Sequence, residues 1–356
     1  GAKVNMRTLG LTKEAPFGRC PDSKGHEATT LFELAEKAGL ATGIVSTARI
    51  THATPASTYA KSASRDWEND TAMGDQAGSG CKDIAAQLIE WSAGDGFEVV
   101  FGGGRSNFMP STAKDPEYEK KSGRRGDGRD LIAEWTGKSE DHTYIWNQAE
   151  FDKIDFASDA KVLGLFEPSH MQYELDRAKD KAGEPALSEL TRAAITRLSQ
   201  DKDGYVLMVE GGRVDHGHHA NNAKRALEDV NALDMAVKTA MDMTDDEDTL
   251  ILVTADHSHV FVIAGYSARN NPILGKSATG IGTYMKGADG KPYTTLGYWN
   301  GPGSVCTKEK DGKMMCMRPD ITKVDTEADD YLQQSLIPMG SETHGGEDVA
   351  IFARGP

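Results

Sequence analysis

Apolar and polar positions follow two recurring patterns along this chain. Short apolar runs rich in β-branched residues are typical of buried strands, and between them apolar residues recur every three or four positions, as on one face of a helix. We predict strands at 41–46, 97–101, 161–166, 204–209, 249–254 and 349–353, and helices at 29–38, 83–91, 187–198 and 221–243. Strands that alternate with helices favour an α/β fold with a largely parallel central sheet and helices on both faces.

Two stretches interrupt this alternation. Residues 105–160 are strongly charged, and residues 265–340 are rich in Gly, Tyr, Lys and Pro without a helical period. The second stretch is long for a loop, which favours a small inserted subdomain. We therefore predict an α/β domain over 1–264 and 341–356, continuing beyond both ends of the chain, with an insertion over 265–340.

Composition narrows the class of protein. The 356 residues are 38% hydrophobic and 27% charged, which is typical of a soluble globular protein, and no apolar run is long enough to span a membrane. The net charge of −15 argues against nucleic acid as a partner, because nucleic acids attract basic surfaces. A site for an anionic substrate in so acidic a chain needs local positive charge from metal ions or a placed Arg.

The four cysteines are Cys20, Cys81, Cys306 and Cys316, and none forms a CxxC pair of the kind found in zinc–thiolate sites. Cys306 and Cys316 flank a turn and can close a small loop, which leaves Cys20 and Cys81 to pair over a longer one. The even number favours two disulfides and a periplasmic or secreted protein over four free thiols.

Histidines and acidic residues gather where predicted strands end, and this is where active sites of open α/β sheets lie. Asp215 and His219 are four residues apart, so on a helix they project from one face. Carboxylate and imidazole together suit Zn²⁺, whereas a single such pair can also be a solvated helix start. The clustered residues are Glu210, Asp215, His216, His218 and His219, then Asp256, His257 and His259, and finally His344.

Two further segments carry weaker indications. Asp256 and His257 are adjacent, so both reach one ion only if the chain turns there, and the alternative is an ordinary capping Asp. His52 and Thr54 follow another predicted strand, and Arg65 lies 13 residues after His52. Taken alone, Thr54 reads as a turn hydroxyl and Arg65 as a surface ion-pair partner.

Taken together, these segments resemble the alkaline phosphatase family over nearly the whole chain. Three of them are similar to the metal signatures of that family, and a fourth is similar to its magnesium and phosphate-binding region. The matching segments are 209–219, 254–258, 343–348, 51–56 with 64–65, 80–84 and 164–168.

The resemblance implies a site with two zinc ions and one magnesium ion. It assigns Asp215, His219 and His344 to the first zinc and Asp256 and His257 to the second. For magnesium it implies Thr54 and Glu210 as ligands, with His52 in contact with those ligands. Arg65 would hold two phosphate oxygens, and His216 would lie near the phosphate, as in the animal-type and marine-bacterial-type variants.

The resemblance also implies features outside this centre. Phe166 through its carbonyl, Glu167 and Glu184 would bind a peripheral Ca²⁺, although Glu167 and Glu184 also read as a surface acidic pair. The insertion would be crown-like and would lie next to the interface of a homodimer.

Phosphate monoesters would be hydrolysed through a phosphoserine. In the family, the nucleophilic Ser and an Asp that bridges zinc and magnesium precede the segment that matches Gly1. We therefore expect both residues outside this chain, either upstream or on a companion N-terminal fragment, and we expect residues 1–356 alone to be inactive. Ser23 follows an Asp but matches a non-catalytic segment. The alternatives are a phosphodiesterase- or sulfatase-like hydrolase and a non-catalytic metal- or phosphate-binding protein.

Overall fold

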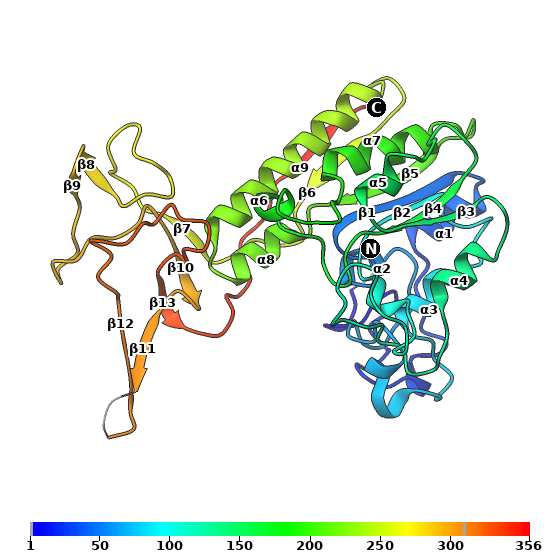
Figure 1. The fold of residues 1–356 in the computed structure, drawn as a ribbon, viewed down its shortest axis with the longest axis horizontal. Helices are drawn as coiled ribbons and strands as arrows, with labels where there is room; N and C mark the ends of the chain where they lie inside the picture. The colour runs from blue at the N-terminus through cyan, green and yellow to red at the C-terminus, as the bar shows by residue number, and fades with distance from the viewer. Residues whose placement is uncertain (1–2, 309–310) are drawn as a thin grey trace. The chain divides into compact units, whose positions relative to one another are not determined.

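The computed structural model describes residues 3–308 and 311–356 (Figure 1). The chain divides into two compact units. Unit 1 comprises residues 1–172, 176–211 and 232–243, and unit 2 comprises residues 173–175, 212–231 and 244–356. Among the described residues, no helix is both long and apolar enough to cross a bilayer.

A five-stranded parallel sheet forms the centre of unit 1, which confirms the predicted fold class. Its strands lie in the order β3-β4-β2-β1-β5, and every pair of neighbours is parallel. The bounds are β1 (Ala41–Arg49), β2 (Val99–Gly103), β3 (His142–Ile145), β4 (Lys161–Leu165) and β5 (Tyr205–Glu210). Because parallel strands end at the same edge, the segments after β1 and β5 share one edge of this sheet.

Helices cover both faces of the sheet, as predicted. Successive apolar side chains on a strand point to opposite faces. Ile44 packs in a cluster with α1, α3 and α4, whereas Val45 packs in a second cluster with α5 and α7. The bounds are α1 (Leu31–Lys37), α2 (Ala53–Ala56), α3 (Ile84–Ile89), α4 (Leu131–Thr136), α5 (Gln148–Phe151) and α7 (Leu187–Leu198), with 3-10 turns at Pro21–Ser23, Thr71–Gln76 and Arg105–Asn107.

Local sequence explains where these elements start. Thr30 caps α1 in a capping box, in which its hydroxyl accepts from the Glu33 N–H and the Glu33 carboxylate accepts from the Thr30 N–H. The predicted helix at 187–198 has the same bounds as α7. The charged stretch 105–160 holds α4, α5 and β3, which the sequence patterns did not reveal because each is only four to six residues long.

Unit 2 is built of a short helix and small sheets. Helix α8 (Arg213–His219) precedes α9 (Ala223–Met243), and both α9 and α6 (Glu174–Arg177) contain residues of the two units. The predicted strands at 249–254 and 349–353 appear as β6 (Ile251–Thr254) and β14 (Ile351–Arg354), which pair antiparallel with each other. The remaining strands are β7 (Phe261–Ile263), β8 (Ala278–Gly280), β9 (Thr283–Tyr284), β10 (Leu296–Gly301), β11 (Val305–Lys308), β12 (Met314–Met317) and β13 (Ser335–Pro338).

Both predicted disulfides are present. Cys20–Cys81 lies in unit 1, and Cys306–Cys316 joins the antiparallel pair β11 and β12 in unit 2. The first bridge closes a separation of 61 residues and the second a separation of 10.

Candidate metal centre

Helix α8 presents two of the predicted zinc ligands. Asp215 and His219 lie on one face of this helix, with 3.3 Å between Asp215 Oδ1 and His219 Nε2. Gly217 lies between them, and a Cβ there would come within 2.7 Å of the Ala226 main-chain nitrogen. A larger residue at 217 would therefore push α8 away from the start of α9 and displace both ligands.

Three further imidazoles converge on the same carboxylate. Measured to Asp215 Oδ1, the Nε2 atoms lie at 3.0 Å for His259, 3.4 Å for His344 and 3.9 Å for His257. The chain turns directly after β6, which brings His257 to the group, and His259 forms a β-bridge with His344. We call Asp215, His219, His257, His259 and His344 the histidine cluster.

The donor atoms of the histidine cluster fit a bound cation. Asp215 Oδ1 and His259 Nε2 are buried, and neither makes a hydrogen bond of acceptable geometry within the described residues. Buried polar atoms without a partner are costly, whereas a cation between them would satisfy both. One carboxylate and several imidazoles form a borderline-soft donor set of the kind that suits Zn²⁺.

The predicted ligand Asp256 lies at the margin of the histidine cluster. Its Oδ2 is 3.3 Å from His257 Nε2, and its side chain is largely exposed to solvent. The His257 ring stacks on that of His344, with 3.5 Å between the ring centroids. The structure thus brings the five predicted zinc ligands into one region of unit 2.

Burial and charge set the protonation of this region. Burial raises the pKa of Asp215, but His259 and His219 outweigh it and hold the pKa well below its usual range. Burial lowers the pKa of His259, but Asp215 and Glu342 outweigh it and raise that pKa to about 9. His218 is neutral at physiological pH, because burial and the neighbouring His259 lower its pKa to about 4.

The predicted phosphate- and magnesium-binding residues of unit 1 lie around the ends of β1 and β5. The Arg65 Nη2 is 3.2 Å from His52 Nε2. The Ser46 hydroxyl donates to Glu210 Oε2 at 2.5 Å, so a hydroxyl already contacts this predicted magnesium ligand. Thr54 lies in α2 and is exposed.

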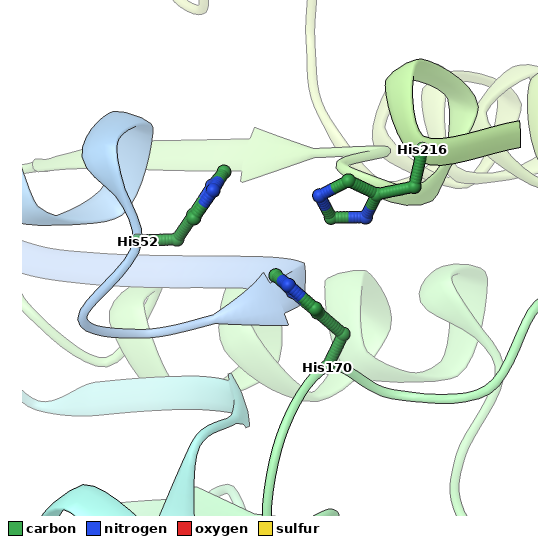
Figure 2. Close-up of side chains that lie close together, drawn as sticks. All are labelled: His52, His170 and His216. Atoms are coloured by element: carbon green, nitrogen blue, oxygen red, sulfur yellow. The ribbon is translucent and has the colours of Figure 1, made fainter. Parts of the chain in front are cut away.

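Sequence reasoning missed His170 in this region. Its ring meets that of His52 edge to face, with 5.2 Å between centroids (Figure 2), and its Nε2 is 2.6 Å from the Arg49 guanidinium. A carboxylate from Glu68 holds the same guanidinium through two 2.7 Å bonds. The single His in the segment after β4 gave no pattern that could have revealed it.

His216, which Figure 2 also labels, comes from α8 in unit 2. Within that unit its Nδ1 is 3.1 Å from the Arg213 guanidinium. The predicted contact of His216 with phosphate stays a prediction.

A group of carboxylates lies near the predicted calcium ligands in unit 1. Ligand atoms of Glu117, Glu167 and Asp180 lie within 4.8 Å of one another, and Glu184 joins them through Gln172, whose main-chain N–H donates to Glu184 at 2.8 Å. We call these four residues the acidic cluster. Sequence reasoning missed Glu117 and Asp180, which are far from Glu167 in the chain.

The acidic cluster holds more negative charge than its protein contacts offset. Asp180 Oδ2 and Glu184 Oε2 are buried without a hydrogen-bond partner among the described residues. Burial raises the pKa of Glu184 to about 8, and burial together with Asp180 raises that of Glu117 to about 7. The Phe166 carbonyl accepts a 2.8 Å bond from Arg105, which leaves one lone pair for a cation.

Comparison with known proteins agrees with this geometry. A family model for alkaline phosphatase matches residues 1–356. The tissue-nonspecific alkaline phosphatase of Rattus norvegicus is 43% identical over 363 residues, which cover 100% of this chain and 66% of the rat protein. The alkaline phosphatase of Gadus morhua is 41% identical over 362 residues, which cover 100% of this chain and 72% of the cod protein. The chain belongs to the alkaline phosphatase family.

The fold is also similar to that of a solved alkaline phosphatase structure. The crystal structure of Thermus thermophilus alkaline phosphatase matches with a TM-score of 0.58 and 31% identity, over 75% of this chain and 48% of that one. Because the chain belongs to the alkaline phosphatase family, it is not assigned to a sulfatase-like or phosphodiesterase-like family. Family membership also implies metal cofactors, for which the histidine and acidic clusters are the candidates.

Proposed function

We propose that this chain forms the metal-binding part of an alkaline phosphatase that hydrolyses phosphate monoesters. The observation that carries the proposal is the histidine cluster, in which four imidazole nitrogens lie within 3.9 Å of one buried carboxylate oxygen. The family match supports the reaction class. A site of this kind recognises the phosphoryl group and leaves the organic part of the ester loosely specified.

The proposed site contains two zinc ions and one magnesium ion. Zinc bound there would supply Lewis acidity and a water that ionises near pH 7. The proposed ligands are Asp215, His219 and His344 for one zinc, Asp256 and His257 for the other, and Thr54 and Glu210 for magnesium.

Residues of this chain also orient the substrate. We assign Arg65 to two phosphate oxygens, because its planar guanidinium can donate two parallel hydrogen bonds. His52 holds one end of that guanidinium at 3.2 Å and so limits its rotation. His216 is also assigned to the phosphate.

The nucleophilic Ser is proposed to come from residues outside 1–356, with a phosphoserine as intermediate. Ser23 is unsuited to this role, since its hydroxyl is buried and donates to the Cys20 carbonyl at 2.8 Å. It also lies against the Cys81 sulfur, 3.9 Å away.

The test is hydrolysis of p-nitrophenyl phosphate at alkaline pH with added Zn²⁺ and Mg²⁺. We expect residues 1–356 alone to bind zinc without turnover, and the chain extended by the upstream family segment to turn over. Turnover by 1–356 that is abolished in Ser23→Ala would contradict the proposed nucleophile. Absence of turnover in a zinc-loaded extended chain would contradict the proposed function.

The acidic cluster is proposed to bind one Ca²⁺. Calcium takes six to eight oxygen ligands at 2.3–2.6 Å, and carboxylates are its preferred donors. Glu117, Glu167, Asp180 and Glu184 supply such oxygens, and the Phe166 carbonyl supplies another.

A homodimer is also proposed, with the insertion at its interface. The sheet β13-β10-β7 has one face on which Val262, Trp299 and Leu336 are 52%, 53% and 67% exposed. A monomer in sedimentation of the extended chain would count against this assembly.

The two disulfides support a periplasmic or secreted location, because such bridges persist in oxidising compartments. Four free thiols in protein isolated from its source would contradict this location.

A further inference from the structure

Glu342 is a buried carboxylate to which no role in the site has been given. It is 2% exposed and precedes the predicted ligand His344 by two residues. A fully buried Glu is rare unless its oxygens are paired, so its partners indicate why it is there.

Both oxygens of the Glu342 carboxylate accept hydrogen bonds from one segment. Oε1 accepts from the Val260 main-chain N–H at 2.7 Å, and Oε2 lies 2.6 Å from His259 Nδ1. An ionised carboxylate can only accept, so His259 carries a proton on Nδ1 and turns Nε2 toward Asp215 Oδ1, 3.0 Å away.

The main chain of Glu342 orients a second imidazole. Its carbonyl oxygen is 2.6 Å from His219 Nδ1, and its N–H donates to the His219 carbonyl at 2.9 Å. A carbonyl can only accept, so His219 also carries a proton on Nδ1 and presents an unprotonated Nε2 when neutral. This is the tautomer that a metal-binding His requires.

We propose that Glu342 is a positioning residue that sets the zinc affinity of the histidine cluster. Its carboxylate fixes His259, whose Nε2 lies 3.0 Å from Asp215 Oδ1, while its main chain fixes His219. The inference rests on the proposed zinc centre, but it concerns a residue that is not among the proposed zinc ligands.

The size of the effect follows from known outer partners of metal ligands. Removing a group that orients a ligating His costs about 10–100-fold in metal affinity. Loss of the carboxylate alone should reach the lower end of this range, because it frees His259 to rotate away from the proposed ligand Asp215, which lies 3.0 Å from its Nε2. The main-chain bond to His219 survives any side-chain replacement at 342.

The experiment is a zinc titration of residues 1–356 against a competing chelator. The variants are Glu342→Gln, which keeps the shape but loses one acceptor, and Glu342→Ala, with Glu327→Ala as an exposed control in the same unit. We expect zinc dissociation constants about 10–100-fold higher for both Glu342 variants and unchanged for the control. Circular dichroism establishes that each variant is folded.

The outcomes separate this inference from the proposed function. Weak zinc binding by the wild type would overturn the zinc centre itself. Tight binding by the wild type and equally tight binding by folded Glu342→Gln would overturn the role of Glu342 and leave the centre in place.

If both Glu342 variants unfold, histidine NMR of the wild type decides. The inference requires a proton on Nδ1 of both His219 and His259, with their signals assigned by comparison with His219→Asn and His259→Asn. A His259 side chain without a proton on Nδ1 would overturn it.

Discussion

The histidine cluster and the acidic cluster are both suited to cations, but they differ in donor chemistry. In the histidine cluster one carboxylate is surrounded by imidazoles, and its pKa is lowered. In the acidic cluster carboxylates surround one another, and the pKa values of Glu117 and Glu184 are raised. Nitrogen donors favour zinc, whereas an all-oxygen set favours a hard ion such as calcium.

The two clusters balance the negative charge of their carboxylates in different ways. The protonated ring of His259 offsets the charge of Asp215, as the raised pKa of His259 indicates. In the acidic cluster, the Arg105 guanidinium donates to the Glu117 carboxylate at 2.8 Å. The remaining repulsion between the carboxylates favours their protonated forms, as the raised pKa of Glu184 indicates. Zinc bound at the histidine cluster would therefore compete with protons on nitrogen, and calcium bound at the acidic cluster would compete with protons on oxygen.

The largest expected effect is at Asp215. Asp215→Ala removes the oxygen on which four imidazoles converge, so zinc affinity should fall by more than the roughly 100-fold limit for an outer partner. Isothermal titration with zinc checks this, with Asp311→Ala as an exposed control. If folded Asp215→Ala bound zinc with an affinity within threefold of that of the wild type, the histidine cluster would not be the zinc site, and the contrast with the acidic cluster would fail.

Calcium should stabilise unit 1 through the acidic cluster. A ligand at 100 times its dissociation constant stabilises a folded protein by about 2.7 kcal/mol. Thermal unfolding should therefore shift upward with calcium in the wild type and much less in Glu117→Gln. An equal shift in both proteins would place the calcium elsewhere.

A pH dependence should distinguish the acidic cluster when no cation is bound. Burial raises the folded-state pKa of Glu184 to about 8, against about 4.3 for an unfolded Glu. The neutral carboxyl is favoured in the folded chain, so stability falls as pH rises from about 4 to about 8 and stays low above that.

Glu184→Gln is neutral at every pH and should lose less stability over this range. Scanning calorimetry of metal-free protein at pH 5 and pH 9 checks this, and calcium at pH 9 should restore the wild type. An identical pH dependence in the variant would show that Glu184 is not the source.

Ser23 should matter least for either cluster. Its hydroxyl donates to the Cys20 carbonyl and contacts the Cys81 sulfur only at 3.9 Å, so Ser23→Ala should cost about 1 kcal/mol of stability. Zinc and calcium affinities should both equal those of the wild type. A change in either affinity would mean that this region reaches a metal site.

The two clusters also show what sequence can reveal. Asp215 and His219 share one helical turn shortly after strand β5, so spacing alone placed them together. Glu117, Asp180 and Glu167 come from separate loops, and no periodicity links them. His170 and Glu342 were missed as functional residues because their role depends on contacts with Arg49 and His259 that only folding creates.

For the fold as well, the sequence revealed the features that depend on local patterns and missed those that depend on contacts between distant segments. Short apolar runs gave the five-stranded sheet apart from β3, and the strong helical period gave α7 with its observed bounds. The pairing of β6 with β14 joins segments about 100 residues apart, and neither strand carries a pattern that names its partner.

The most direct test of the zinc centre is anomalous diffraction from zinc-loaded crystals, measured on both sides of the zinc absorption edge. The account predicts a zinc peak about 2 Å from Asp215 Oδ1 and from the Nε2 atoms of His219 and His344. It predicts no zinc peak at the acidic cluster, where calcium should bind instead. A zinc peak confined to the acidic cluster, with none beside Asp215, would contradict the account.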